Sequence, residues 1–496
     1  MKRTASLIMK NFHQNDCFGI MSEGHSAAGS TAKKFISLGL AFVMAFVVCV
    51  LLGPAARAQK INLPPVTRIR LDNGAQIVVM EYHRAPSLSL TALFAGGSAL
   101  DPADKSGVAG LTGSLLRKGT ATRTATQIAE QIDTLGGSLD AGAGADRLQV
   151  GLSVLSKDTD TGLELFVDII RHPTLPDEEL DRERQLEISD LQAIGEDPGV
   201  IASRVANETV YAGHPYGREP TITTLKAITQ DDLRAYYGRV CVPNRLILVA
   251  VGDFKTAEML AKLKAKFGDW QRSTETVAPL PMVSAATTSR KVVLVDKPDA
   301  TQTQVRWIRT AFARNSPDYF AGLLAEAITG GGFTSRLINE IRVNRSLTYG
   351  ISSRFGTQLA GGEFVVSTFT KIETTKALID ATTTVLRQTA LKGFMPAEVQ
   401  KFKNYLAGQF AIQVQSPEAL AAQLGNIAFY QLPADYLQTY LLRLRAVSLA
   451  DANLIARTYF SPDALSLVLV APAAKIKSQL TGLGSIETRA VDTIGK

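Results

Sequence analysis

Apolar and polar positions alternate with a period of two in several short stretches of the chain and with a helical period in others. "TRIRLDNGAQIVVMEYH" places Asn73 and Gly74 between two alternating runs, which predicts a β-hairpin. "SLSLTALFAGGSAL" and "DRLQVGLSVLS" predict further strands. Helices are predicted near 107–118 and 124–135, at "DTGLELFVDIIRHP" and over 177–194. Because strands and helices do not alternate strictly, we expect an α+β fold, with helices covering one face of a sheet.

The second half of the chain repeats the plan of the first. "LPDEELDRERQLEISDLQAIGEDP" corresponds to "MPAEVQKFKNYLAGQFAIQVQSP" at an offset of 219 or 220 residues. The paired positions are Pro176 with Pro396, Glu178 with Glu398, Pro198 with Pro417, and Pro243 with Pro462. A constant offset indicates an internal duplication. We expect two similar domains, 59–269 and 290–496, each a mostly antiparallel sheet covered by helices. A linker rich in Pro, Ser and Thr, residues 270–289, joins them.

The first 58 residues are typical of an export signal that follows a polar extension. Two lysines precede an uncharged run over 35–52, a Gly-Pro pair follows, and Ala-Arg-Ala ends at Ala58. We expect cleavage after Ala58 and a periplasmic or otherwise exported protein. The apolar run is also about long enough to span a bilayer, so an uncut anchor stays open. We expect contact with a membrane only in that case.

Composition and charge narrow the choice of partners. The chain has 496 residues, of which 46% are hydrophobic and 20% charged, as in ordinary globular proteins. Residues 1–58 carry six of the basic residues and two of the acidic ones, so the net charge falls from +7 to +3 without them. This balance gives no reason to expect binding to nucleic acid. Cys241 is the only cysteine after residue 58, which excludes an internal disulfide there.

Several motifs occur in one order along the chain. These are "GGSALDPADKSGVAGLTGSLLRKGT", "RHPTLPDEELDRER" and "GHPYG" at 213–217. Together with the duplication they resemble the insulinase-type, inverted-zincin peptidases of family M16. The resemblance is closest to two-domain bacterial members related to mitochondrial processing peptidase, and it covers nearly all of the chain after the signal. It implies that the two domains together form a clamshell.

The resemblance implies where a metal site would lie. In that family one helix carries H-x-x-E-H, whose histidines bind zinc while the glutamate acts as general base, and a downstream glutamate completes the metal shell. Here the histidine positions fall on Gly110 and Ser114, the base on Gly113 and the distal carboxylate on Asp190. Only Asp190 retains a metal-binding group, and it equally fits a solvated charge on a helix. A catalytic zinc needs about three protein ligands, so we expect no metal in this chain.

The remaining histidines do not replace the lost ligands. His83, His172 and His214 have no metal-binding partner at helical spacing. His172 is predicted to end a helix, where the helix dipole favours it, and His214 to pack a turn. We therefore expect no cofactor in this chain and zinc in a partner chain.

The segment "AITGGGFTSRLINEIRVNRSLTYGISSRF" (327–355) resembles a second family signature. It implies that Arg342 and Tyr349, seven residues apart, face the zinc across the substrate chamber. A guanidinium and a phenol there would stabilise negative charge on the carbonyl oxygen. The two side chains converge only if the chain reverses between them. Otherwise they are a surface arginine and a strand tyrosine.

Three glycines beside this pair are predicted to bind substrate. Gly330, Gly331 and Gly332 leave the backbone open where a peptide passes closely. The strands expected after Tyr349 would hold an extended peptide by edge addition, as the resemblance implies.

The sequence thus predicts the non-zinc subunit of a two-chain peptidase, which lends Arg342 and Tyr349 to an H-x-x-E-H partner for the cleavage of extended peptides. One alternative is a peptide-binding or assembly protein without a part in hydrolysis. Another is a hydrolase with Ser114 as nucleophile, although no base stands near it and helical serines mostly bond their own backbone.

Overall fold

The computed structural model describes residues 63–284 and 290–495, within one compact unit that spans 60–496. The predicted signal and its cleavage after Ala58 lie outside the described residues. Among the described helices, none combines the length and the apolar character that crossing a bilayer requires.

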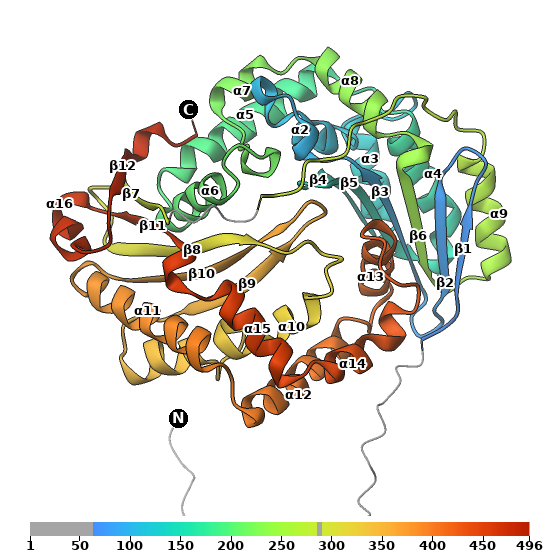
Figure 1. Ribbon diagram of the computed structural model, residues 1–496. Coiled ribbons are helices and arrows are strands. Elements are labelled where there is room, and N and C mark those ends of the chain that lie inside the picture. The colour runs from blue at the N-terminus through green and yellow to red at the C-terminus, as the bar shows by residue number, and fades with distance from the viewer. Residues whose placement is uncertain (1–62, 285–289, 496) are drawn as a thin grey trace, which may run out of the picture. The chain divides into compact units, whose positions relative to one another are not determined.

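The first half contains a six-stranded sheet with the order β1-β2-β6-β3-β5-β4 (Figure 1). Its strands are β1 (Val66–Arg70), β2 (Gln76–Glu81), β3 (Ser87–Ala95), β4 (Ser138–Ala143), β5 (Arg147–Leu155) and β6 (Leu246–Gly252). All neighbours are antiparallel except β2 and β6. The predicted hairpin joins β1 to β2, and Gly74 takes φ +95° in its turn, which is why glycine suits this position.

Four helices of this half confirm predicted ones. They are α2 (Val108–Leu115), α3 (Ala125–Thr134), α4 (Thr159–Arg171) and α5 (Asp177–Ile194). Four further helices were not predicted: α6 (Pro198–Val210), α7 (Ile222–Ala227), α8 (Gln230–Val240) and α9 (Thr256–Phe267). The first turn of α3 shows how the sequence sets a helix start. Thr124 accepts a hydrogen bond from the Gln127 amide, and the Gln127 side chain accepts one from the Thr124 amide, which is a capping box.

The second half repeats this sheet with the order β12-β7-β11-β8-β10-β9. Its strands are β7 (Val292–Asp296), β8 (Gln302–Ala311), β9 (Ile351–Thr357), β10 (Gly362–Lys371), β11 (Ser466–Ala471) and β12 (Ile486–Ala490). Five strands follow the order of the first sheet, which confirms the predicted duplication. The outer strand differs, because β1 pairs with β2 antiparallel whereas β12 pairs with β7 parallel.

The helices of the second half also follow the repeat. They are α10 (Tyr319–Glu326), the π-helical segments η6 (Ala327–Gly331) and η7 (Ile338–Asn344), α11 (Thr375–Lys392), α12 (Pro396–Ile412), α13 (Pro417–Phe429), α14 (Tyr436–Ala446), α15 (Leu449–Tyr459) and α16 (Ala473–Ile476). Pro198 and Pro417, paired in the sequence, are the first residues of α6 and α13. Proline suits this position because the first helical N–H has no partner within the helix.

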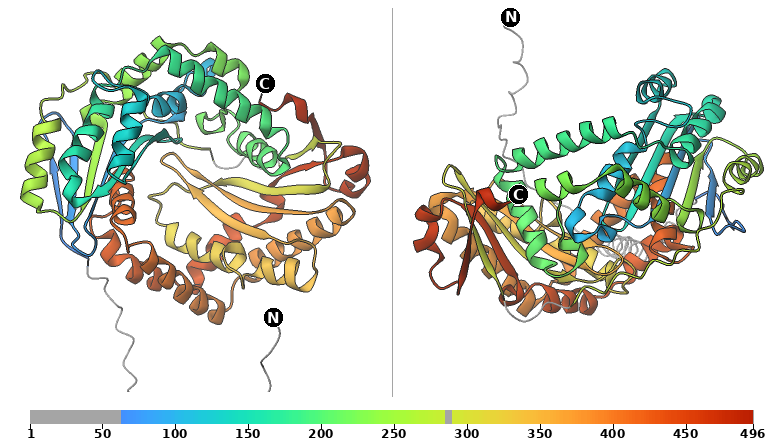
Figure 2. Two further views of the ribbon diagram at one scale, coloured as in Figure 1. Left: turned by 180° about the vertical axis from the view of Figure 1, so that it is seen from behind. Right: turned by 90° about the horizontal axis from the view of Figure 1, so that it is seen from above.

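Each sheet is covered on its second face by a helix from the other half. The helix α13 packs on β3 and β6, and α6 packs on β8 and β11 (Figure 1). Seen from behind, α13 still lies beside the first sheet (Figure 2). Ile77 on β2 belongs to the core under the helices of its own half, whereas its neighbour Val78 belongs to the core that contains α13. We expected helices on one face only. The central strands β2 and β6 are nearly continuous apolar runs because both of their faces are buried.

The described part of the predicted linker, residues 270–284, forms neither helix nor strand but is not a free spacer. Trp270 packs edge-on against Phe94, with ring centroids 6.1 Å apart. The Val283 amide donates to the carbonyl of Ala360 at 2.7 Å. The segment therefore contacts both halves, while the exact domain boundaries stay a prediction.

Candidate functional site

The helix α2, which carries three of the four predicted metal positions, is held at its first turn by a buried carboxylate. Asp101 accepts hydrogen bonds from the amides of Gly107 at 2.8 Å and Ala109 at 3.1 Å. Burial raises the pKa of Asp101 to about 7, and these two hydrogen bonds oppose the increase. The pair of bonds fixes where α2 begins.

The two glycines of α2 have different surroundings. Gly113 lies against strand β4, where a Cβ atom on Gly113 would come 2.7 Å from the Cα atom of Gly142. Gly110 faces open space, with no atom within 4 Å of such a Cβ. Close approach of another backbone therefore explains Gly113 and does not explain Gly110. Ser114 is half-buried on the same helix.

The distal position, Asp190, is exposed on α5, which packs against α2. Its neighbour Glu187 has a raised pKa, because of burial and because of the nearby charges of Asp190 and Glu183. Within the described ranges, no three His, Cys, Asp or Glu side chains lie where they could hold a metal ion together. Glycine has no donor atom in its side chain, so Gly110 and Gly113 cannot bind a metal. The absence of a metal from this chain stays a prediction.

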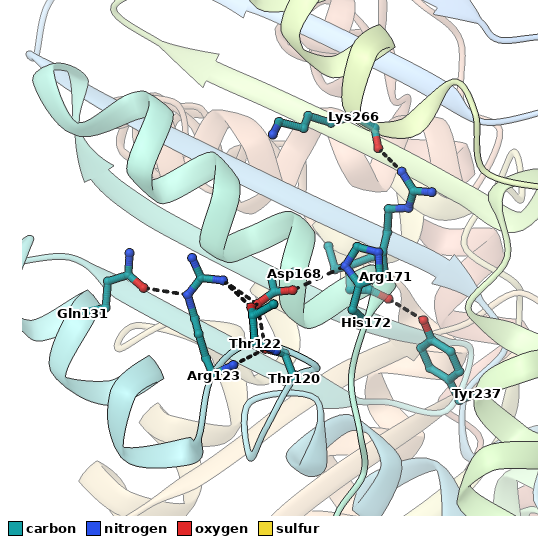
Figure 3. A network of polar contacts seen from close by, with 10 residues as sticks. Thr120, Thr122, Arg123, Gln131, Asp168, Arg171, His172, Tyr237 and Lys266 are labelled. Carbon is teal, nitrogen blue, oxygen red and sulfur yellow. Dashed lines mark hydrogen bonds and ion pairs between the residues drawn. The ribbon is translucent and has the colours of Figure 1, made fainter.

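His172 ends α4, as predicted, and takes part in a polar network (Figure 3). Its Nδ1 atom lies 3.3 Å from the carboxylate of Asp168. Asp168 also accepts from Thr120 at 2.6 Å, Thr122 at 2.9 Å and Arg123 at 2.6 Å. Burial would raise the pKa of Asp168, but these hydrogen bonds together lower it. The network fixes the turn that joins α2 to α3.

The other two histidines also have structural contacts. His214 packs the turn of "GHPYG", as predicted, with its ring centroid 4.5 Å from that of Tyr216 and its Nε2 atom 2.8 Å from the Pro281 carbonyl oxygen. His83 is exposed between Asp253 and Glu81, and hydrogen bonds from its ring to these carboxylates raise its pKa.

The "GHPYG" turn joins the two halves, which its sequence does not predict. The Tyr216 hydroxyl donates to Asp146 at 2.5 Å and accepts from the Ala360 amide at 3.1 Å. The other oxygen of Asp146 accepts from the Leu359 amide at 2.9 Å. Leu359 and Ala360 lie between β9 and β10, so these bonds tie that hairpin to the first half. The "GHPYG" motif can be recognised in the sequence, but nothing in the sequence shows that it contacts a turn more than a hundred residues later.

Arg342 and Tyr349 line one pocket together with residues at the end of β10. Its described lining is Gln302, Arg342, Ser346, Leu347, Thr348, Tyr349, Phe369, Thr370, Lys371 and Thr374. Arg342 lies in η7, and Tyr349 lies two residues before β9 rather than in the strand. Between them, Ser346 takes a left-handed backbone conformation with φ +52°. Tyr349 is 81% exposed.

The three predicted substrate-binding glycines do not line this pocket. Gly330 lies against β9, where a Cβ atom would come 2.5 Å from the Ser353 nitrogen. A Cβ on Gly332 would come 3.0 Å from the ring of Phe402. Gly331 ends η6. Internal packing therefore accounts for Gly330, and the binding of substrate by the three glycines stays a prediction. β9 is the outer strand of its sheet, as edge addition of a peptide requires.

A buried glutamate beside this region gives the protein a pH-dependent stability. Glu326 ends α10 and accepts a hydrogen bond from the Phe355 amide. Burial raises the pKa of Glu326 to about 8, whereas the pKa of an unfolded glutamate is about 4.3. The pKa of Glu326 is higher in the folded protein than in the unfolded chain. Its contribution to the stability of the fold is therefore fully present below about pH 4 and is lost as the pH rises to about 8.

We therefore expect Glu326→Gln to remove this loss. The difference in unfolding free energy between the variant and the wild type should grow in favour of the variant by about 2–4 kcal/mol between pH 5 and pH 8. Chemical denaturation at several pH values measures it, with Glu130→Gln on the exposed side of α3 as the control. A difference that does not change with pH would contradict the assignment.

Comparisons with known proteins match both halves of the chain. The family model described as "Insulinase (Peptidase family M16)" matches residues 77–224, and the model "Peptidase M16 inactive domain" matches residues 227–406. An uncharacterized zinc protease of Mycobacterium leprae is 26% identical over 365 residues, 73% of this chain and 82% of the relative. A non-peptidase homolog of Helicobacter pylori is 21% identical over 408 residues, 81% of this chain and 93% of the relative.

Solved structures have the same fold. The crystal structure of a peptidase M16 inactive domain from Pseudomonas fluorescens is similar with a TM-score of 0.77 and 25% identity, over 82% of this chain and 98% of that one. A protease from Helicobacter pylori gives a TM-score of 0.77 at 20% identity, over 83% of this chain and 100% of that one.

Proposed function

Since the chain belongs to peptidase family M16, we propose that it is the non-zinc subunit of a two-chain peptidase. It binds a second M16 chain that carries an intact H-x-x-E-H helix, and zinc resides in that chain. Arg342 and Tyr349 then stabilise the negative charge that develops on the peptide carbonyl during hydrolysis. We propose that the assembly is exported, as the N-terminal sequence suggests, and that it cleaves extended peptides.

One observation carries this proposal. A guanidinium and a phenol, exposed on separate elements, line the same pocket in a chain whose metal helix has no zinc ligands. Neither side chain is needed for the internal packing, because both are exposed. The pair fits a reaction centre that another molecule completes.

Reconstitution tests the proposal. We expect this chain and an M16 chain with an intact H-x-x-E-H helix to copurify as a complex that holds one zinc per pair and cleaves unstructured peptides. Each chain alone should have little activity, and this chain alone should bind no zinc at stoichiometric level. Stoichiometric zinc and cleavage by this chain alone would contradict the proposal.

A second candidate function is peptide binding or assembly without hydrolysis. The Helicobacter pylori relative, which is named a non-peptidase homolog, favours it. The two candidates differ in one result: a complex whose activity does not depend on Arg342 or Tyr349 supports binding alone.

A further inference from the structure

The turn that carries Tyr349 leaves the sheet just where its backbone pairing ends. The last pair between β9 and β10 joins Ile351 to Thr368, and β10 continues to Lys371 beside β8 alone. The turn 346–350 therefore has no strand partner on β10. Its first residues are bonded to the preceding helical segment instead, because the amides of Ser346 and Leu347 donate to the carbonyl oxygens of Arg342 at 3.2 Å and Ile341 at 3.0 Å.

Two threonines of β10 replace the missing backbone bonds. The Thr370 hydroxyl donates to the Leu347 carbonyl oxygen at 2.6 Å, and the Thr368 hydroxyl donates to the Gly350 carbonyl oxygen at 2.9 Å. Thr368 is 3% exposed and Thr370 2% exposed. They are two residues apart in one strand, so both point to the same face. One hydroxyl binds each side of Tyr349.

The turn also closes on itself. Thr348 is buried, and its side-chain oxygen accepts from the Gly350 amide at 3.1 Å. The Thr368 hydroxyl lies 3.3 Å from that of Thr348. The backbone on both sides of Tyr349 is thus bonded to buried groups, while the Tyr349 side chain remains 81% exposed. An exposed side chain on a fixed backbone suits a group that meets another molecule.

We propose that Thr368 and Thr370 are positioning residues, which hold the turn 346–350 and thereby place the Tyr349 phenol beside Arg342. The anchoring is a property of this chain alone. Its consequence for catalysis rests on the proposed function. Replacing Thr368 or Thr370 by valine removes one buried hydrogen bond to the turn. We therefore expect each substitution to lower kcat of the complex about tenfold.

The first test needs no partner. We expect Thr370→Val, and Thr368→Val likewise, to speed hydrogen exchange of the amides of residues 347–350 by about tenfold, while Thr370→Ser restores slow exchange. The control is Thr382→Val, the same change at a buried threonine in α11 whose hydroxyl has no hydrogen-bond partner among the described residues. Unchanged exchange in both β10 variants would overturn the anchoring.

The second test uses the reconstituted complex. We expect Thr368→Val, which unlike Thr370→Val changes no residue of the pocket lining, to lower kcat about tenfold at an unchanged KM. It should have no further effect in a Tyr349→Phe background, because this threonine acts only through the phenol. Equal losses in both backgrounds would overturn the positioning role. A complex indifferent to Tyr349→Phe would overturn the proposed function and the catalytic consequence together, whereas the anchoring would still be decided by exchange.

Discussion

Arg342→Ala is expected to lower kcat of the reconstituted complex by about 100- to 1,000-fold, the range seen when one donor to a developing oxyanion is removed. The KM and the zinc content should stay unchanged, because the guanidinium acts on charge that exists only in the transition state. Tyr349→Phe, which keeps the ring and removes the hydroxyl, should lower kcat in the same way. Steady-state kinetics with a fluorogenic peptide measures both.

Arg345→Ala is the matched control for this experiment. Arg345 is three residues from Arg342 and also exposed, but its side chain pairs with Glu340 at 2.7 Å and does not line the pocket. We expect its loss to change kcat less than twofold, since exposed ion pairs contribute little. Equal effects at Arg342 and Arg345 would mean that surface charge, not a positioned guanidinium, supports activity.

The two glycines of α2 should respond to alanine in opposite directions. Gly113→Ala places a methyl group 2.7 Å from the backbone of β4, so helix and strand must separate. We expect a loss of about 1–3 kcal/mol in the free energy of unfolding. Gly110→Ala meets no atom within 4 Å, so it should stabilise the protein by about 1 kcal/mol through helix propensity. Chemical or thermal denaturation of the two variants measures the contrast.

The same two substitutions test how far helix α2 has diverged from an H-x-x-E-H helix. If both substitutions stabilise the protein, the close contact between α2 and β4 is absent in solution. If Gly113→Ala destabilises it, restoring the H-x-x-E-H sequence needs more than three side chains, because a glutamate at 113 would first have to displace β4.

Local patterns predicted much of the fold. The hairpin at Gly74, the helix over 177–194 and the repeat of Pro198 in Pro417 depend on neighbours in sequence or on a constant offset, and all three are confirmed. Strand β4 was not predicted, because its sequence "SLDAGA" is small and lacks the β-branched residues that mark strands.

The contacts between the halves could not be predicted. An amphipathic pattern shows that α6 and α13 bury one face, but it does not say which sheet receives it. Likewise, nothing near Asp146 in sequence indicates that Tyr216 and the turn after β9 will bind it. For the candidate site, the spacing of Arg342 and Tyr349 was readable, whereas the threonines that hold the turn lie on a strand about twenty residues later.

Because α6 and α13 each cover the sheet of the other half, the first sheet cannot be fully covered until most of the chain has been made. The first sheet is complete in sequence once β6 ends at Gly252, yet one of its apolar faces stays bare until the ribosome has added α13, which ends at Phe429. Either half alone would therefore expose one apolar face of its sheet, so we expect neither half to fold as a self-sufficient unit.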